Sequence, residues 1–444
     1  MNLLTYNTLF TVDDAMNAVP DLVDTYENTS DTEWLFHLKQ GVKFHDGSVM
    51  TAEDVKASLE RAKGCAEVAN YTNTVETVEV VDENTVKVTT ATPSATLLYD
   101  LGNHGNAILP KALIDSDNDF SKNPIGTGPY KFVSWTSGVE LQFEAFDEYF
   151  GSAPAIKKMT WKIIPEGSSR TISLEAGEVD FVMGVEAVDV ERIEASDKLA
   201  TVSHESNIIS WMNMNNEKPG MDNEALRHAI NCAINKEDIV TVAGNGQGSV
   251  AVAQVPMGMP GYSDENADQY DPEKAKEWLD KSGVDPSTVE FPILCSSESK
   301  KRVAEVIQAN LKEVLGINAT IESMDLATYV SAAAEGNFVA AIGGYSANDI
   351  VSFLKGVYHS RSIGSSNQTR TNDAAIDGAI DAIATTIDPA EREAKIQALA
   401  AQLNARCPQV PLYQGQNLCA FQADLQGVTL NSAGMTRFEK LSWK

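Results

Sequence analysis

The sequence predicts a mixed α/β fold that is divided into two or three domains. Its 444 residues are too many for one ordinary hydrophobic core. Helical and strand-like patterns alternate along the chain, and long helical connections between strands are typical of parallel or mixed sheets. Apolar residues make up 43% and charged residues 22% of the chain, as expected for a soluble globular protein.

The first clear unit in the sequence is a strand, a turn and a helix. Apolar side chains alternate over residues 34–38, which is the pattern of a half-buried strand. Gly47 permits the turn that follows. Thr51 and Asp54 match a capping box at the start of a helix, and Gly64 suits its end.

Further strands and helices follow from periodicity and from the residues that start and stop helices. Valine-rich segments around an Asp-Glu-Asn turn predict a hairpin, and a Gly/Pro loop leads into another strand pair. Asp-Pro pairs mark two helix starts, and glycine or proline marks the ends. The predicted elements are a hairpin at 77–90, a loop that leads into a strand at 123–135, its partner strand at 138–150, helices at 271–283, 301–316 and 388–408, and a strand at 317–323.

The chain is strongly acidic, with 63 acidic and 34 basic residues and a formal net charge of −29. Nucleic acids and anionic lipids are therefore poor partners, because both require a basic surface. We interpret the charge as a solvated acidic surface that favours solubility. No apolar run approaches the length of a transmembrane helix. The first residues lack the positive region of a signal peptide, so the protein is either cytoplasmic or its targeting segment is not in this sequence.

The cysteines do not form a recognisable metal or redox motif, because no CxxC pair occurs. In an exported protein, an odd number of cysteines leaves at least one thiol free or paired between chains. Two of them, Cys407 and Cys419, are close in sequence and could form a bridge. The five cysteines are Cys65, Cys232, Cys295, Cys407 and Cys419.

Sequence motifs of common enzymes are absent. There is no GxSxG elbow, no HExxH helix and no phosphate-binding P-loop. The glycine-rich segment at 244–248 lacks the GxGxxG spacing and follows a helix, which argues against a dinucleotide site. The six histidines are scattered, and no two of them are spaced as metal ligands on one helix.

One short region nevertheless contains residue types that are found in catalytic sites. His37, His45, Asp46, Glu53 and Asp54 are of the types that a hydrolytic metal or a general base requires. Each also has a local structural use, in a strand, in a turn or at a helix start. A catalytic interpretation of this region is therefore unnecessary.

Five motifs in order resemble the peptide/nickel group of ABC-transporter solute-binding proteins, family 5. The first is WLFHLKQGVKFHDGSVMTAEDV at 34–55, and the second is NPIGTGPYKFVSW at 123–135. SSRTISLEAGEVDFV at 168–182, the segment at 212–240 and YDPEKAKEWLDKSG at 270–283 follow in the family order. Together they span nearly the whole chain.

The resemblance implies a two-lobed periplasmic-binding-protein fold of type II, cluster C, with an extra subdomain in the first lobe. A ligand would bind between the lobes, which would close on it by a hinge motion. The family usually carries a further strand ahead of residues 3–10, so we expect part of the first lobe's sheet to be missing. The expected divisions are lobe I at 1–12, 126–221 and 405–444, the subdomain at 13–125, and lobe II at 222–404.

The ligand position departs from the pattern of the family's peptide binders. These typically hold the peptide amine with an aspartate in a G-W-x-x-D-type segment. Here residues 340–354 read AAIGGYSANDIVSFL, with Tyr345 in place of tryptophan. The aspartate falls on Asn348 or, after a shift of one residue, on Asp349. If Asn348 holds the place, the ligand is a blocked peptide, a peptide with a different amine geometry, or not a peptide.

Other candidates follow from residue type and from their place in the family pattern. Aromatic and amide groups suit a peptide backbone, and arginine can hold a carboxylate with two hydrogen bonds. Each also has a plain interpretation as a core or surface residue. His104 and Asn103 are candidates for the rim of the pocket. The ligand-binding set is Tyr6, Asn7, Trp211, Asn213, Tyr345, Asn348, Asp349, Arg361, Arg370 and Tyr413.

The function that the resemblance implies is capture of short peptides and their delivery to an ABC-transporter permease. The protein would be an extracytoplasmic monomer, free in a periplasm or lipid-anchored, with no cofactor, metal or catalytic residue. A first alternative keeps the fold but binds a nickel chelate or another small solute, with His359 as the best placed histidine. A second alternative is an exported hydrolase that uses the opening His/Asp region.

Overall fold

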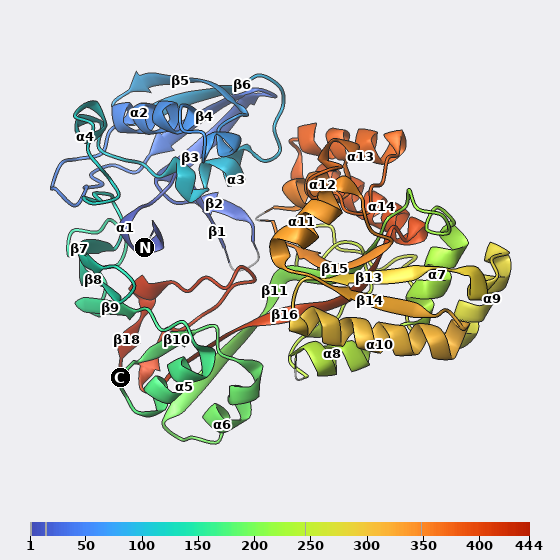
Figure 1. The fold of residues 1–444 in the computed structure, drawn as a ribbon. Coiled ribbons are helices and arrows are strands. Elements are labelled where there is room, and N and C mark those ends of the chain that lie inside the picture. The colour runs from blue at the N-terminus through green and yellow to red at the C-terminus, as the bar shows by residue number, and fades with distance from the viewer. Residues whose placement is uncertain (1, 14–15, 245, 348) are drawn as a thin grey trace. The chain divides into compact units, whose positions relative to one another are not determined.

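A computed structural model describes residues 2–13, 16–244, 246–347 and 349–444, and Figure 1 shows its elements. The chain forms two compact units. The first unit comprises Met1–His204 and Leu418–Lys444, and the second comprises Glu205–Asn417. The predicted α/β class with more than one domain is confirmed. The finer division into lobes and a subdomain stays a prediction.

A four-stranded antiparallel sheet of the first unit contains, in order, β3 (Val23–Ser30), β4 (Glu33–Leu38), β6 (Thr85–Thr90) and β5 (Val75–Asp82). Trp34, Phe36 and Leu38 are buried and alternate with more exposed residues, as predicted. Helix α2 (Ala52–Lys63) packs on β5 and β6. Its capping box of Thr51 and Asp54 is present. The strand, turn, helix and hairpin predicted for this region are therefore confirmed.

A second antiparallel sheet of the first unit contains, in order, β7 (Tyr130–Thr136), β8 (Glu140–Ala145) and β9 (Lys158–Lys162). Helix α5 (Gly167–Glu175) then leads to β10 (Phe181–Met183). Short elements complete this unit. They are α1 (Asn2–Thr5), β1 (Phe10–Val12), β2 (Ala18–Pro20), α3 (Leu97–Leu101), α4 (Lys111–Asp115), α6 (Val190–Glu194), β17 (Leu425–Gln426) and β18 (Ser442–Trp443).

Two long strands, β11 (Leu199–Met214) and β16 (Gln409–Gln422), run through both units. In the second unit, β11 is followed across the sheet by β15 (Ala340–Tyr345), β13 (Phe291–Cys295) and β14 (Ala319–Ser323). The pairs β13–β15 and β13–β14 are parallel, as the long helical connections predict. Strand β12 (Ser249–Val250) pairs with β16, and β10 pairs with β16 in the first unit.

The helices of the second unit start and end as the sequence predicts. Asp271 accepts hydrogen bonds from Glu273 and Lys274 at the start of α9, and Gly283 takes a left-handed conformation at its end. Gly316 ends α10 in the same way, and Pro389 is the first residue of α14. The helices are α7 (Glu224–Ala233), α8 (Lys236–Gly244), α9 (Pro272–Ser282), α10 (Glu298–Leu315), α11 (Leu326–Glu335), α12 (Ile350–Tyr358), α13 (Ala374–Thr385) and α14 (Pro389–Arg406).

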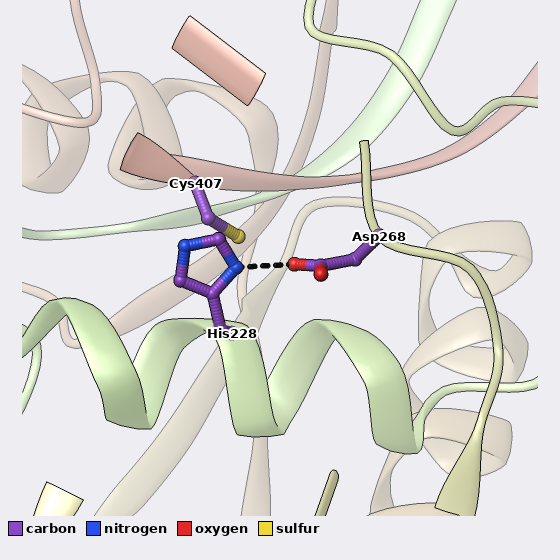
Figure 2. A group of neighbouring side chains, drawn as sticks. All are labelled: His228, Asp268 and Cys407. Carbon is purple, nitrogen blue, oxygen red and sulfur yellow. Dashed lines mark hydrogen bonds and ion pairs between the residues drawn. The ribbon is translucent and has the colours of Figure 1, made fainter. Parts of the chain in front are cut away.

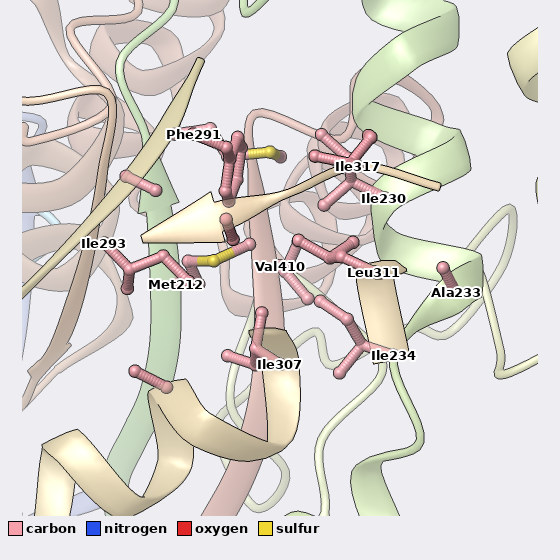
Figure 3. Close-up of a cluster of buried hydrophobic side chains, with 14 of the residues drawn as sticks. Met212, Ile230, Ala233, Ile234, Phe291, Ile293, Ile307, Leu311, Ile317 and Val410 are labelled. Atoms are coloured by element: carbon pink, nitrogen blue, oxygen red, sulfur yellow. The ribbon is translucent and has the colours of Figure 1, made fainter. Parts of the chain in front are cut away.

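The main hydrophobic core of the second unit lies between its sheet and helices α7 and α10 (Figure 3). Met212 and Ile293 come from the sheet, Ile230 from α7, and Ile307 and Leu311 from α10. Each of these side chains is fully buried. The apolar faces of α7 and α10 therefore provide the rigid support for β11 and β15, which carry several candidate site residues.

The five cysteines are all free thiols. The bridge considered between Cys407 and Cys419 does not form. Cys65 is partly exposed, and the other four are buried. Burial raises the pKa of the Cys232, Cys295, Cys407 and Cys419 thiols. They are therefore small core residues rather than reactive groups.

Candidate functional site

Asn7 joins two motifs that are far apart in the sequence. Its Nδ2 donates to Oδ2 of Asp21 at 2.9 Å, and its Oδ1 accepts from the Thr127 hydroxyl at 3.1 Å. Both ends of the amide are therefore bonded to protein, and Asn7 and the adjacent Tyr6 are nearly buried. Burial raises the pKa of Tyr6 to about 12. These contacts show that Asn7 holds the N-terminal segment against the loop that contains Thr127.

His45 makes a second connection to the same loop. Its Nε2 lies 2.9 Å from the carbonyl oxygen of Gly128, and the Gly126 N–H points to its Nδ1 at 3.5 Å. The ring also packs edge-on against Phe146. This pattern requires the neutral ring, with the proton on Nε2 donated to Gly128. Burial lowers the pKa of His45 to about 4, with a further lowering by Lys131.

The carboxylates of the same region accept hydrogen bonds from other protein groups. Asp46 accepts from the backbone N–H and hydroxyl of Ser48, and Asp54 accepts from Thr51 and from the backbone N–H of Lys111. These bonds fix a turn and a helix start. The hydrogen bonds of His45, Asp46 and Asp54 therefore explain why these residue types occur here without any catalytic role.

Trp211 and Tyr345 are brought together in the second unit. They lie on the paired strands β11 and β15, and both rings pack edge-on against Phe353 of α12. Trp211 is 3% exposed and belongs to an apolar cluster, whereas Tyr345 is partly buried. The contacts of Trp211 are those of a core residue.

Asn213 lies on the same strand as Trp211 and is joined to two residues that sequence reasoning missed. Its Nδ2 donates to Oε1 of Gln368 at 2.8 Å, and the Tyr329 hydroxyl lies 3.3 Å from the same oxygen. A Cβ atom on Gly343 would lie 2.7 Å from the Asn213 amide, so only glycine leaves room for this group. Neither Gln368 nor Tyr329 belongs to a motif, and no pattern in the sequence pointed to them.

Asp349 is the N-cap of α12. Its side chain accepts from the backbone N–H of Ser352 at 2.8 Å, and it is 8% exposed. Burial raises the pKa of Asp349, although the bonds to Ser352 act in the opposite direction. One oxygen of this carboxylate is therefore committed to the helix. The neighbouring candidate, Asn348, lies outside the described residues.

The two candidate arginines differ in their surroundings. The side chain of Arg361 is 81% exposed and lies 4.0 Å from Asp381. Arg370 is held by Glu217 at 2.5 Å and donates to the carbonyl oxygen of Ala334. Arg370 also has a left-handed backbone conformation, with φ of 55°. Its guanidinium is therefore largely engaged by protein, while that of Arg361 faces solvent.

The remaining candidates lie on β16, at the end of α12 and in the first unit. Tyr413 is partly buried on β16, where it lies opposite Val250 of β12. His359 is 4% exposed, and its Nδ1 accepts from the Arg361 backbone N–H and lies 3.5 Å from Asp377. In the first unit, Asn103 caps a short 3-10 helix that begins at His104.

A buried group of unlike polar side chains, which we call the His228 cluster, consists of His228, Asp268 and Cys407 (Figure 2). They come from α7, from the segment before α9 and from the end of α14. Their donor atoms lie within 4.8 Å of one another. Imidazole, carboxylate and thiolate are zinc ligands, so the His228 cluster is a candidate metal site.

The contacts within the His228 cluster favour an ion-pair network over a cation site. Nδ1 of His228 lies 2.5 Å from Oδ2 of Asp268, which is a direct hydrogen bond. A zinc ion between them would need about 2.0–2.2 Å to each atom. Nε2 of His228 faces the carbonyl oxygen of Ala405 at 2.9 Å, so both ring nitrogens face acceptors, as in an imidazolium. Lys274 adds a second positive charge 3.2 Å from Asp268.

The pKa of the Asp268 carboxyl is lowered by these neighbours. Burial alone would raise the pKa of Asp268, but its hydrogen bond to His228 and the charges of His228 and Lys274 outweigh burial and lower it. Close to the cluster, Lys236 is fully buried and its Nζ has no hydrogen-bond partner among the described residues. Burial lowers the pKa of Lys236 to about 8. A further cation would be repelled here.

A protein-family model matches residues 17–365, which is well over half of the chain, and it describes bacterial extracellular solute-binding proteins, family 5. The chain belongs to this family. The recognition that rested on five sequence motifs is thereby confirmed.

Individual relatives support the family 5 assignment. Heme-binding protein A of Haemophilus influenzae is 26% identical, over 95% of this chain and 84% of that protein. Glutathione-binding protein GsiB of Pectobacterium atrosepticum is 30% identical, over 72% of this chain and 63% of that protein. The structure of the periplasmic binding protein DppA of Helicobacter pylori with the peptide STSA matches with a TM-score of 0.77 and 25% identity, over 99% of this chain and 92% of that one.

Family 5 membership confirms the predicted class of periplasmic-binding-protein folds and the general role of an ABC-transporter solute-binding protein. Proteins of this family bind solutes and are not classified as enzymes. None of the described helices has the length and apolar character that a membrane crossing requires. Which residues contact the ligand stays a prediction.

Proposed function

We propose that this family 5 protein captures short peptides and delivers them to an ABC-transporter permease. The observation that carries the proposal is the match of the family 5 model to residues 17–365. A relative that binds glutathione and a structural neighbour that holds the peptide STSA support a peptide-sized ligand. A protein of this kind works outside the cytoplasm, either free in a periplasm or lipid-anchored, and we expect it to be a monomer.

We infer that the candidate ligand residues divide into supporting and contacting groups. Asn7, Trp211, Asn213 and Arg370 are engaged by other protein groups, and they would shape the site rather than hold a charged end of the ligand. Other candidates would contact the ligand, and Arg361 is the more exposed of the two arginines that could hold its carboxylate. The contacting group is then Tyr6, Tyr345, Asn348, Arg361 and Tyr413.

The helix-capping bond of Asp349 bears on how the peptide amine is held. Because Asp349 caps α12 through Ser352, we propose that Asn348 takes the place of the family's amine-binding aspartate. An amide lacks the negative charge that attracts an ammonium group. The protein would then discriminate little between peptides with free and with blocked N-termini.

Native mass spectrometry of the purified protein, followed by denaturation, tests the proposed ligand class. A ladder of peptide masses would support the proposal, and a single non-peptide mass or a metal would overturn it. The second candidate function, binding of a non-peptide solute, is favoured by the heme-binding relative that matches 95% of this chain. The nickel-chelate version is less well supported, because His359 is buried.

Thermal-shift titration with matched free and N-acetylated peptides tests the role proposed for Asn348. A ligand raises the melting temperature by mass action, so relative affinities can be compared. The variant Asn348→Asp is expected to favour free-amine peptides by about tenfold, since one new charge contact contributes about 1–3 kcal/mol. Ser346→Asp, at an exposed position in the same segment, is the matched control. Equal responses of both variants would contradict the assignment of Asn348.

A further inference from the structure

The side-chain amides of Asn213 and Gln368, which we call the amide pair, form one hydrogen bond where two amides can form two. Nδ2 of Asn213 donates to Oε1 of Gln368 at 2.8 Å. The reverse bond, from Nε2 of Gln368 to Oδ1 of Asn213, does not occur in the described part of the chain. One donor group and one acceptor oxygen therefore stay open on two adjacent side chains.

The surroundings of Gln368 hold its amide in one orientation. The Tyr329 hydroxyl donates to Oε1 of Gln368 at 3.3 Å, and Tyr329 is itself 4% exposed. Gly343 lies beside the same group, since a Cβ atom there would be 3.3 Å from Oε1 and 2.7 Å from the Asn213 amide. Oε1 thus faces Asn213 and Tyr329, and Nε2 points away from both. A side chain that is held in this way loses little further rotamer freedom when a ligand binds.

The two open atoms of the amide pair lack partners among the described residues, although the pair is largely buried. Asn213 is 2% exposed and Gln368 is partly buried. Buried polar groups are nearly always paired, and an unpaired one destabilises the protein. Neither atom is one of the fully enclosed side-chain atoms without a partner in the described part of the chain, so both can be reached from outside. The partners that they require therefore come from bound molecules.

The amide pair lies on the same face of the second unit's sheet as two aromatic candidates for the ligand site. Asn213 follows Trp211 by two residues on β11, and Tyr345 follows Gly343 by two residues on β15. Because Trp211 and Gly343 are directly paired, all four positions share one face. Aromatic side chains beside a fixed donor and acceptor are typical of sites that bind small solutes.

We propose that Gln368 contacts the ligand and that the amide pair recognises an amide group of this ligand. Nε2 of Gln368 donates to the carbonyl oxygen of that group, and Oδ1 of Asn213 accepts from its N–H. An ester or a carboxylate offers no N–H and leaves Oδ1 unpaired, so the amide pair discriminates against both. The inference rests on the proposed function, because short peptides carry amide groups in their backbone and in asparagine and glutamine side chains.

Native mass spectrometry of ligand-stripped protein, loaded with an equimolar pool of random tripeptides to pentapeptides, tests this proposal. Gln368→Glu should bind about tenfold less peptide than wild type. The glutamate still accepts from Asn213 and Tyr329, but it places an oxygen where the open donor was. Gln397→Glu adds the same charge at an exposed glutamine of α14 and is the matched control, which should bind like wild type. The urea midpoints of both variants should equal that of wild type.

Gln368→Met separates loss of the open donor from the added charge. It removes Nε2 without introducing a carboxylate, so it should also bind less peptide than wild type, by about fivefold. The sequences of the bound peptides show which amide is recognised. A uniform loss over all sequences indicates a backbone amide, whereas a loss confined to peptides with asparagine or glutamine indicates a side-chain amide. Both results support recognition of an amide group.

Peptide binding by Gln368→Glu at the wild-type level would overturn the inference. Wild-type binding by Gln368→Met would also overturn it, even beside a loss in Gln368→Glu, because the open donor would then be unused. If Gln368→Glu does not fold, the result for Gln368→Met decides. A wild-type protein that binds no peptide from the pool would overturn the proposed function together with this inference. A wild-type protein that binds peptides, with variants that bind them equally, would overturn this inference alone.

Discussion

Two buried histidines, one in each unit, show how the same side chain can stabilise a fold by different physical means. His45 of the first unit is bonded to the backbone of Gly126 and Gly128, which requires the neutral ring. His228 of the second unit lies between Asp268 and the carbonyl oxygen of Ala405, a pattern that matches a charged ring. A buried ion pair is sensitive to the loss of one partner, whereas a buried neutral ring is sensitive to acid.

The largest effect is expected from removing the carboxylate that balances His228. Asp268→Ala should lower the free energy of unfolding by about 3–5 kcal/mol, because it leaves the charges of His228 and Lys274 without their buried partner. Urea unfolding followed by far-UV circular dichroism measures the change. Asp264→Ala, an exposed carboxylate on the same segment, is the control and should change stability by less than about 0.5 kcal/mol. If Asp268→Ala also changed the free energy of unfolding by less than about 0.5 kcal/mol, the ion-pair interpretation would be contradicted.

Lowering the pH should destabilise the protein through His45, whose ring is neutral in the folded state. The pKa of His45 is lowered from 6.5 to about 4 in the folded protein. The unfolded chain therefore takes up a proton first as the pH falls, and stability decreases between pH 6.5 and pH 4 by about 3 kcal/mol from this group. Above pH 7 the group contributes no pH dependence.

The comparison of wild type with His45→Gln isolates this effect from that of other acidic groups. Glutamine keeps one donor and one acceptor but does not titrate. The stability difference between the two proteins should therefore shrink steadily between pH 7 and pH 4 in urea unfolding experiments. A difference that stays constant over this range would show that His45 does not change its proton affinity on folding.

Replacing Lys236, close to the His228 cluster, is expected to increase stability. Its ammonium is fully buried and has no hydrogen-bond partner in the described part of the chain, and burial lowers its pKa from 10.5 to about 8. Lys236→Met should stabilise the protein by about 1–3 kcal/mol at pH 7, because an apolar side chain replaces an uncompensated charge. The cost is present while the lysine is protonated, so the gain should fade as the pH rises from 8 to 10.5. Thermal and urea unfolding at pH 7 and pH 10 check both statements, and a gain that grows with pH would contradict them.

The contrast between the two histidines also shows what a sequence can predict. The motif around His45 was recognisable, and its strand, turn and helix follow local rules of alternation and capping that concern neighbouring residues. The bonds from His45 to Gly126 and Gly128 were not predictable, because they join positions more than eighty residues apart. The same limit applies to His228, Asp268 and Cys407, whose proximity depends on the packing of three separate segments.

The candidate ligand site was predictable only as a region. The family pattern led to the segment around Tyr345, but it did not show that Asp349 caps α12. Gln368, which contacts Asn213, and Tyr329, which contacts Gln368, follow no motif. Residue type alone therefore overestimates the number of side chains that are free to contact a ligand, because it does not show which are already bonded to protein.

The smallest expected effect concerns the carboxylates next to His45, and it separates local from tertiary roles within the first unit. Glu53 is exposed in the first turn of α2, so Glu53→Gln should cost only about 0.3–1 kcal/mol through the helix dipole. Asp54 accepts bonds from Thr51 and from the distant Lys111 backbone, so Asp54→Asn should cost about 1–3 kcal/mol. Urea unfolding of both variants measures the difference. Equal costs would mean that the bond to Lys111 adds nothing, and that the segment is held to the rest of the unit mainly through His45.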